Sequence, residues 1–502
     1  MTMWYVEAAR ALLLLALAFV LLYLIVGDEG APGGPLFALL LIFVAASVAG
    51  KLAGLLKLPP LLGMLCVGIA LRNVPYVGPR VGGRVDSQWS AAIRLLALTL
   101  ILCRAGLAFD LDALSRLRWV VARLALLPCL CEAAVIAGLA ATLLDFPAAW
   151  SALLGFVVAA ISPAVVVPSL LALQDQGYGA ATGIPTMVVA AAPLDDVLCI
   201  AGFGICLAFS ITGSDSSPLW LDVARAPLEL VAGVGCGMLG GLVVPKLAPP
   251  AQTAGADVAR APKGGAELLL GLCASSALGL KRAGLSGASA LSVLVMAIVA
   301  ARGWGKASTK PLSALLADAW NFVAQPLLFG LVGSAVAVDT LEARVVGLGL
   351  AMLSCSLTVR CTVAYLAVLG RGLSWKERVF TSMAWIPKAT VQAAIGAIAL
   401  DEATNERERE MGRDVVAITV MSILCTAPLG AVAISTFGPR LLLKDGVSSI
   451  PKDATPEVVA TPEVVANNAA VVPEMHPAKD SEVHIVPVHV SCMQRLCVYL
   501  NC

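Results

Sequence analysis

The chain has 502 residues, of which 59% are apolar and only 13% carry a charge. A soluble protein has roughly 25% charged residues, and a chain so poor in charge cannot cover a surface exposed to water. The composition therefore excludes a soluble multidomain enzyme, and its hydrophobicity excludes disorder over most of the chain. The net charge of +1 argues against a nucleic-acid partner. A polytopic membrane protein remains.

Apolar runs recur along the chain from its beginning to residue 438, with turn-forming residues between them. Because a membrane-spanning helix needs about 20 largely apolar residues, these runs predict an all-α membrane protein with about 14 transmembrane helices. The predicted spans are 8–26, 35–56, 59–72, 90–108, 118–144, 148–173, 183–212, 226–247, 264–280, 288–302, 316–337, 343–370, 375–400 and 413–438. The loops predicted on one side are richer in Lys and Arg, which places both termini in the cytosol.

The character of the chain changes near residue 445. Residues 1–444 are predicted to form the transmembrane domain, and residues 445–502 a disordered cytosolic tail, because this end is polar and contains Pro and a near-duplicate Ala-Thr-Pro-Glu-Val-Val segment. All three histidines, His476, His484 and His489, lie in the tail. An intramembrane His metal site or His proton relay is therefore excluded.

Charged residues inside the predicted spans are the first pointer to function. An ionisable side chain at membrane depth costs at least a few kcal/mol and marks a functional site by default. Several lie near predicted helix ends, where they can reach the interface: Arg94, Arg123, Glu229, Glu267, Asp318 and Arg344. Five lie too deep for that explanation: Glu132, Asp195, Asp196, Arg360 and Lys388.

Asp195 and Asp196 are adjacent in the middle of the span predicted at 183–212. Neighbours on a helix point about 100° apart, so the two carboxylates are expected to face different surroundings. A carboxylate in a water-filled cavity can hold a proton or a metal cation but not both, which is the minimal chemistry of exchange. In the structural alternative, Arg360 or Lys388 neutralises the pair, which then only holds helices together.

Prolines predict breaks in two spans. Pro removes a backbone donor and clashes with the carbonyl four residues earlier, so Pro163 and Pro168 are predicted to unwind the middle of span 148–173. Pro387 is predicted to break span 375–400 beside Lys388. Unwound backbone at membrane depth survives only where it is buried or lines a cavity. Its oxygens suit a hard cation such as Na⁺, and we expect them at Ala160, Ile161 and Ser162.

The two broken spans occupy corresponding places in two halves of the chain. When the first and eighth spans are set aside, two six-span halves remain, and the break at Pro163 aligns with the break at Pro387. Such a correspondence indicates an inverted-repeat transporter. In the same alignment Glu132 corresponds to Arg360, and we predict that these two form an ion pair.

Three motifs then suggest a family: Ala160-Ile-Ser-Pro-Ala-Val-Val-Val-Pro-Ser, Leu194-Asp-Asp, and Trp385-Ile-Pro-Lys-Ala-Thr-Val-Gln. With them, residues 8–440 resemble the animal NHA-type sodium/proton antiporters, solute carrier family 9 subfamily B, in the cation:proton antiporter 2 group. The resemblance implies an NhaA-like fold with two crossed discontinuous helices, in a homodimer whose core domain moves against a dimerisation domain. It also implies that Asp196 is the essential ion- and proton-binding residue and Asp195 its neighbour, while Glu132, Arg360 and Lys388 balance charge.

The function expected is therefore secondary-active exchange of Na⁺ or Li⁺ for H⁺ by alternating access, without a cofactor and without enzymatic chemistry. The metal site expected is Na⁺ at Asp196 with Asp195. The expected location is the plasma membrane, with endosomal, lysosomal and mitochondrial membranes as alternatives. An intramembrane aspartyl protease needs two facing carboxylates, which adjacent helix residues cannot supply. A sodium-coupled organic-anion symporter of similar design remains, and it would need a polar substrate cavity.

Overall fold

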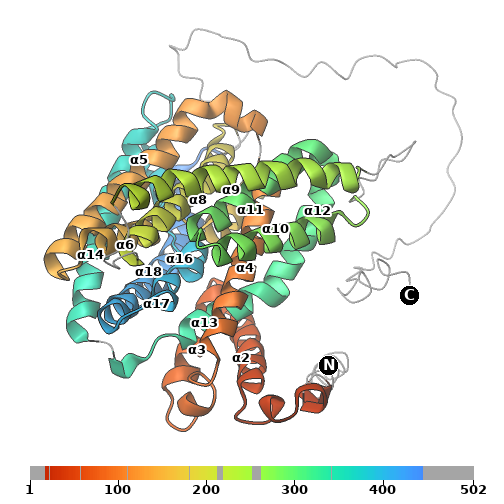
Figure 1. Ribbon diagram of the computed structural model, residues 1–502. Helices are drawn as coiled ribbons and strands as arrows, with labels where there is room; N and C mark the ends of the chain where they lie inside the picture. Colours follow the sequence, from red (N-terminus) through yellow and green to blue (C-terminus); the bar gives the residue numbers. More distant parts are fainter. Residues whose placement is uncertain are drawn as a thin grey trace, which may run out of the picture. The chain divides into compact units, whose positions relative to one another are not determined.

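The computed structural model describes residues 17, 19–21, 23–56, 58–109, 111–179, 181–211, 219–250, 262–340 and 342–444. The predicted tail and most of the first predicted span lie outside these residues. The regular elements of the described chain are all helices, and one isolated β-bridge joins Tyr178 and Lys444, which confirms the all-α prediction for this part (Figure 1).

In chain order the elements are η1 (Gly27–Gly30), α2 (Pro35–Leu55), α3 (Pro60–Asn73), η2 (Gly78–Arg80), α4 (Ser87–Leu107), α5 (Leu111–Leu143), α6 (Ala148–Ala159), α7 (Pro163–Asp175), α8 (Ile184–Ile211), α9 (Leu219–Leu247), α10 (Gly265–Arg282), α11 (Ser286–Trp304), α12 (Lys306–Ala319), the π-turn η3 (Trp320–Ala324), α13 (Gln325–Ser334), η4 (Val338–Thr340), α14 (Ala343–Ala367), α15 (Trp375–Met383), α16 (Thr390–Ile395), α17 (Ile398–Asp401) and α18 (Glu406–Leu441).

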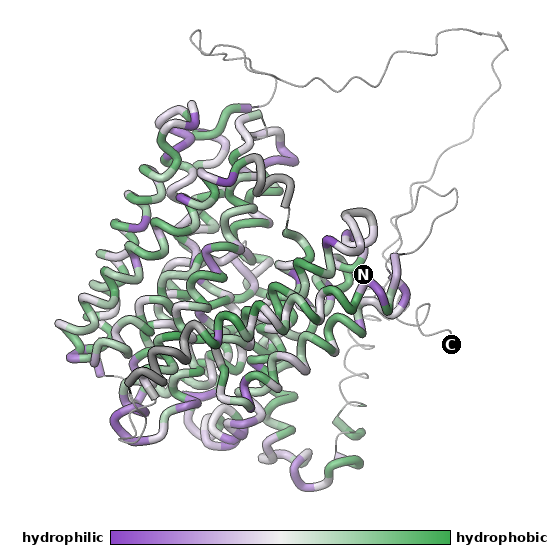
Figure 2. The backbone as a smooth tube through the Cα atoms, turned by 45° about the horizontal axis from the view of Figure 1, so that its top comes forward, coloured by the Kyte–Doolittle hydropathy of each residue, from purple (hydrophilic) through white to green (hydrophobic). Residues whose placement is uncertain are grey.

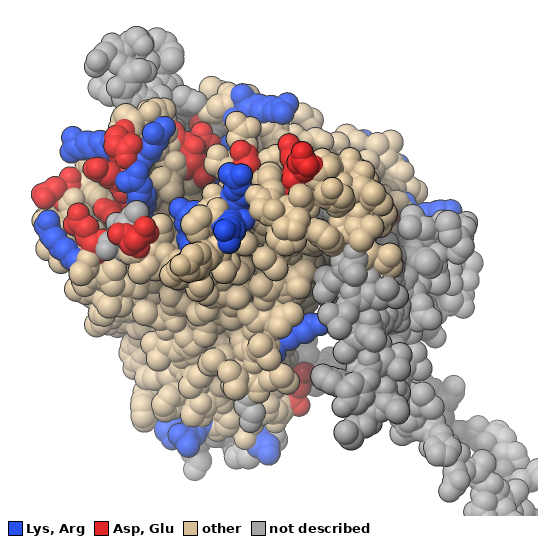
Figure 3. All heavy atoms as spheres, turned by 90° about the horizontal axis from the view of Figure 1, so that it is seen from below, with Lys and Arg blue, Asp and Glu red and all other residues tan. Residues whose placement is uncertain are grey.

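Among the described residues, nine helical segments are long and apolar enough to span a membrane, and three shorter apolar helices accompany them. The short ones, Pro60–Asn73, Ala288–Trp304 and Thr390–Asp401, lie at three of the other predicted spans. Figure 2 shows the hydrophobic stretches along the helices and the hydrophilic residues gathered in the connecting segments. On the face shown in Figure 3, charged residues gather in one region, and uncharged residues form most of the remaining surface.

Local sequence explains where several helices begin. Asp86 caps α4 by accepting hydrogen bonds from the backbone of Gln88 and Trp89, and Ser374 forms a capping box with Glu377 at α15. Such caps satisfy the N–H groups that the first helical turn leaves without partners. The side chains that face outward are apolar in many places; on α9, for example, Leu228, Val231 and Leu239 are 58–69% exposed. An apolar exterior of this kind fits contact with lipid tails.

The helices pack as two groups. In the first, which we call the site group, α5 packs against α6, α8 and α14, and α18 packs against α7, α14, α15, α16 and α17. In the second, the flanking group, α11 packs along α9 and against α4 and α10, while α13 packs against α2 and α3. The groups meet where α8 contacts α9 and α11 and where α16 and α17 contact α4. Figure 1 shows α9 and α11 lying together across the bundle.

Both predicted breaks are present, although one of the three prolines does not break its helix. α6 ends at Ala159 and α7 begins with Pro163 as its first residue, and the backbone between α15 and α16 is non-helical around Pro387. Pro168 lies inside α7, which is continuous, so the prediction of a second break there is wrong. A proline removes one backbone bond, and the other bonds of a helix at membrane depth hold it together because no water can replace them.

Candidate functional site

The five deep ionisable residues come together where the two broken helices meet. Glu132 lies on α5, Asp195 and Asp196 on α8, Arg360 on α14, and Lys388 in the break between α15 and α16. All five are buried, and Asp196 is the most exposed of them at 5%. Helices distant in sequence therefore bring together every residue that the charge analysis selected as too deep to reach the interface.

The two breaks contact each other directly. The backbone N–H of Ser162, in the first break, donates a hydrogen bond of 2.9 Å to the carbonyl of Pro387, in the second. The side-chain amide of Gln392, on α16, donates to the carbonyl of Ala160 at 2.5 Å. The two unwound segments thus provide hydrogen-bond partners for some of each other's backbone groups. Irregular backbone can persist at membrane depth when its polar groups are paired in this way.

Arg360 is the centre of the charge cluster. Its Nη1 donates to Glu132 Oε2 at 2.7 Å, and its Nη2 donates to both carboxylate oxygens of Asp195 at 3.0 and 3.2 Å. The guanidinium also donates to the carbonyl of Trp385 at 2.9 Å and to the carbonyl of Ala159. Ala159 is the last residue of α6, so the cation also lies at the negative end of a helix.

Glu132 binds both cations of the cluster. Besides Arg360, its Oε2 accepts from Lys388 Nζ at 2.9 Å, and its Oε1 accepts from the Ser356 hydroxyl at 3.3 Å. The ion pair predicted between Glu132 and Arg360 is confirmed. The contact with Lys388 and the contribution of Ser356 were not predicted, although Ser356 lies four residues before Arg360, on the same face of α14.

The adjacent aspartates face different surroundings, as predicted. Asp195 is bound by Arg360 and accepts a hydrogen bond of 2.9 Å from the backbone N–H of Ile161. Asp196 Oδ1, by contrast, is buried without a hydrogen-bond partner among the described residues. The structural alternative considered for the pair, neutralisation by Arg360, therefore describes Asp195 but not Asp196.

The oxygens of the first break are mostly engaged. The carbonyl of Ala160 accepts from Gln392, and the carbonyl of Ser162 accepts from the N–H groups of Val165 and Val166 at the start of α7. Ile161 contributes its N–H to Asp195. The Ser162 hydroxyl is buried and has no partner among the described residues, so it is one oxygen of this segment that can bind a ligand.

The cluster contains three carboxylates and two cations. Glu132 and Asp195 are paired with Arg360 and Lys388, and the remaining negative charge is that of Asp196. A buried charge without a partner is costly, so Asp196 requires one positive charge from outside the cluster, either a proton or a monovalent cation. Across the described residues, His, Cys, Asp and Glu side chains form no group of three or more that could hold a metal ion.

Two residues assigned to the interface, Arg94 and Glu229, are buried instead, each with 4% exposure. Arg94, near the start of α4, is 4% exposed and forms an ion pair of 2.5 Å with Asp401, on α17. The sequence placed Arg94 near a helix end, but that end is covered by α17. Arg94 and Asp401 are 307 positions apart, and no motif in the sequence links them.

A helical bundle with two touching helix breaks around buried charges defines a class of membrane protein, the secondary transporters with discontinuous helices. The fold is similar to that of the sodium proton antiporter MjNhaP1 from Methanocaldococcus jannaschii at pH 8, with a TM-score of 0.63, 19% identity, and coverage of 81% of this chain and 98% of that chain.

The sequence places the chain within one family. It belongs to the family described as sodium/hydrogen exchanger, transmembrane, which matches residues 39–438. It is 41% identical over 442 residues to the human sodium/hydrogen exchanger 9B2, covering 86% of this chain and 80% of that protein. It is 40% identical over 430 residues to the human sodium/hydrogen exchanger 9B1, covering 84% and 81%. These relatives are transporters and not enzymes, and the expected resemblance to subfamily B is confirmed.

Proposed function

We propose that the protein exchanges Na⁺ or Li⁺ for H⁺ across a membrane by alternating access, and that cation and proton compete for Asp196. The single observation that carries this proposal is the contrast between the two aspartates: Asp195 is paired with Arg360, whereas Asp196 has no counter-charge among the residues that the structure describes. Membership of the sodium/hydrogen exchanger family supports the choice of ions.

In the proposed cycle, deprotonated Asp196 binds the cation, and the Ser162 hydroxyl supplies a second oxygen. Asp195, Ala160 and Ile161 complete the site: Ile161 and Arg360 hold Asp195 beside the cation, and Gln392 fixes the carbonyl of Ala160. On the other side of the membrane, a proton displaces the cation from Asp196 and allows the return step. Because either ion neutralises the same charge, an empty, charged carrier does not cross.

The charge arithmetic of the site supports one-for-one exchange. Arg360 and Lys388 match Glu132 and Asp195, so only Asp196 gains and loses a positive charge in the cycle. One cation moves for each proton, and the cycle carries no net charge. No cofactor is needed, because the transported ions are the only reactants.

The finer architecture is part of the same proposal. We place 14 helices in residues 1–444, including two six-helix inverted repeats, with the site group as the moving core and the flanking group as the dimerisation domain. Residues 445–502 form a cytosolic tail, both termini are cytosolic, and the homodimer lies in the plasma membrane among lipids. The contact between the two breaks and the packing of the helices in two groups support this arrangement.

Substitution of Asp196 tests the proposal. Asp196→Asn is expected to abolish Li⁺ tolerance in antiporter-deficient cells while expression stays at the level of the parent. Asp175→Asn is the matched control, because Asp175 is exposed at the end of α7, and it is expected to keep full tolerance. Near-normal tolerance with Asp196→Asn would contradict the assignment.

A second experiment separates exchange from organic-anion symport. In proteoliposomes with an imposed pH gradient, addition of Na⁺ alone is expected to dissipate the gradient. A sodium-coupled symporter carries no protons, so addition of Na⁺ alone would leave the gradient intact.

A further inference from the structure

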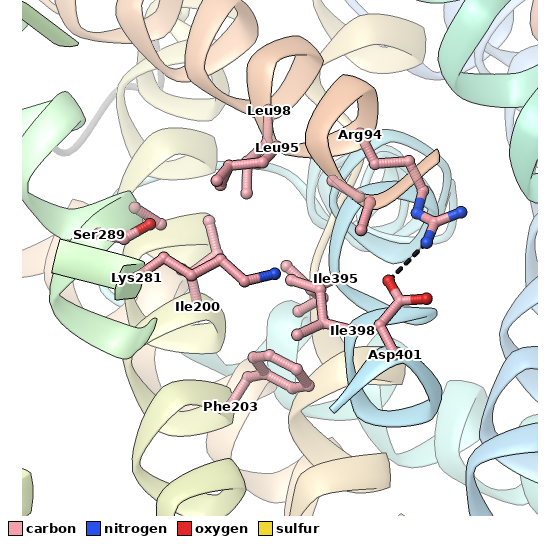
Figure 4. Close-up of a pocket in the computed structure, with 13 residues that line it drawn as sticks. Arg94, Leu95, Leu98, Ile200, Phe203, Lys281, Ser289, Ile395, Ile398 and Asp401 are labelled. Atoms are coloured by element: carbon pink, nitrogen blue, oxygen red, sulfur yellow. Dashed lines mark hydrogen bonds and ion pairs between the residues drawn. The ribbon is translucent and has the colours of Figure 1, made fainter. Parts of the chain in front are cut away.

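A hollow on the boundary between the two helix groups is separate from the charge cluster. It has a volume of about 350 Å³ and is lined by residues of α4 and α10, including Gln88 and Lys281, and by Asp401 and Glu402 at the end of α17 and just after it. It continues into an enclosed space of about 30 Å³, and the two share Ala91, Leu95, Lys281 and Asp401 in their walls. Figure 4 shows the inner space, with Leu95 and Leu98 on one side and Phe203 on the other.

The inner space lies along the helix face that carries the proposed ion site. Ile200 and Phe203 line it, and they follow Asp196 on α8 by four and seven residues. These spacings place all three residues on one face of the helix. Along the helix axis, Ile200 is about 6 Å and Phe203 about 10 Å from Asp196. On α16, Ile395 also lines the space and follows Gln392 by three residues. Along α8, the inner space therefore lies about one to two helical turns from Asp196, on the same helix face.

Two layers close the inner space. The outer layer consists of ion pairs: Arg94 with Asp401 at 2.5 Å, and Lys281 with Glu402 at 3.0 Å. Figure 4 shows the Arg94–Asp401 pair at the rim of the space. The inner layer is apolar and is formed by Leu95, Leu98, Ile200, Phe203, Ile395 and Ile398. A narrow apolar constriction excludes water and ions.

Both ion pairs join one helix group to the other. Arg94 and Lys281 lie on α4 and α10, which pack with α11 in the flanking group, whereas Asp401 ends α17, which packs against α18 in the site group. Arg94 is held in place by a hydrogen bond of 2.5 Å from its Nη1 to Ser90 Oγ. A separation of the two groups at this point would break both ion pairs. The pairs therefore stabilise the closed arrangement relative to the open one.

We propose that this hollow is the closed end of the cation's passage to Asp196, and that the Arg94–Asp401 pair, supported by Lys281–Glu402, is its gate. When the groups separate, the pairs part, the apolar layer opens, and the carboxylates of Asp401 and Glu402 face the incoming cation. The inference rests on the proposed function, since it assigns a route to the exchange site, and it adds the residues that control access from this end.

The test measures access to the inner space in the full chain, purified and placed in lipid nanodiscs, where both ends are open to reagent. A Phe203→Cys variant is labelled with a positively charged methanethiosulfonate reagent, and labelling at position 203 is counted above that of the parent chain. Adding Arg94→Gln is expected to raise the labelling rate about tenfold, by shifting the population toward the open state. Arg302→Gln, an exposed Arg on α11, is the matched control and is expected to leave the rate unchanged.

An equal labelling rate with and without Arg94→Gln would overturn the gate. If Arg94→Gln fails to fold, Asp401→Asn removes the other partner and is expected to give the same increase. A double variant, Arg94→Cys with Asp401→Cys, adds an independent readout. Bridging its two thiols with a short bis-methanethiosulfonate, which forms a disulfide with each thiol and releases methanesulfinate, is expected to stop exchange. A dithiol reductant cleaves both disulfides and is expected to restore exchange, while the treated parent chain stays active. Continued exchange in the bridged protein would also overturn the gate.

Failure of the gate can be told from failure of the proposed function, because labelling does not depend on transport. If the parent chain exchanges Na⁺ for H⁺ and Arg94→Gln leaves the labelling rate unchanged, the proposed gate is wrong and the proposed function stands. Faster labelling in the Arg94→Gln variant, with no Na⁺/H⁺ exchange by the parent chain, means that the access route stands and the proposed function is wrong.

Discussion

Replacing Glu132 by Gln tests whether the charge balance of the cluster sets the cation affinity of Asp196. In the native cluster three carboxylates face two cations, and Asp196 carries the excess. Glu132→Gln removes one negative charge and leaves Lys388 Nζ, 2.9 Å from the substituted side chain, without its carboxylate. Two carboxylates then face two cations, so Asp196 no longer carries an unmatched charge and should bind Na⁺ or Li⁺ more weakly.

The size of the effect follows from Coulomb's law. At an effective dielectric constant of about 20, two unit charges within one side-chain cluster, at a separation on the order of 8 Å, interact by about 2 kcal/mol. This energy corresponds to about a 30-fold change in affinity. The assay is the initial rate of Na⁺-driven proton movement in proteoliposomes with an internal pH dye. The apparent KM for Na⁺ is expected to rise about 30-fold in the variant.

Two further variants separate charge from general damage. Glu267→Gln, at an exposed position on α10, is expected to keep the native KM. Glu132→Gln combined with Lys388→Met leaves two carboxylates and one cation, which restores the single excess charge, and its KM is expected to return to within about threefold of the native value. A native KM in Glu132→Gln, in a preparation that purifies and unfolds like the parent, would refute the reasoning.

Two more substitutions test how the site is held together. Asp195→Asn is expected to lower the free energy of unfolding by about 3–5 kcal/mol, because it leaves the buried charge of Arg360 only partly compensated. Asp196→Asn is expected to keep the stability of the parent chain or to raise it. Equal melting temperatures for these two variants would contradict the reasoning. Gly430→Ala is expected to reduce transport and stability, since its new Cβ would lie 2.2 Å from the Pro387 ring. Gly138→Ala meets nothing within 4 Å and should be neutral or stabilising by up to about 1 kcal/mol.

The sequence was sufficient to locate the five deep charges and two helix breaks, because both features are expensive in a membrane and can persist only under special conditions. The Glu132–Arg360 pair could be predicted for the same reason, since neither charge is tolerable alone. The break at Pro163 was predictable because the proline begins a helix. The error at Pro168 shows that a proline near a break need not extend it, since a helix can lose one backbone bond and continue.

The residues that escaped prediction depend on contacts between distant segments. Lys388 binds Glu132 because the second break turns its side chain toward α5, and the direction of an unwound segment cannot be read from its residues. Arg94 was assigned to the interface because it lies near a helix end. Only the folding of α17 over that end, 307 residues later, places Asp401 beside it.

The central claim, competition of one cation and one proton for Asp196, is tested most directly by proton release. Purified protein in weakly buffered solution is mixed with Na⁺, and released protons are counted against the protein sites. The account predicts release that saturates at no more than one proton per site, falls as the solution is made alkaline enough to deprotonate the site beforehand, and is absent in Asp196→Asn. Undiminished release from Asp196→Asn, or saturation at two protons per site, would contradict it.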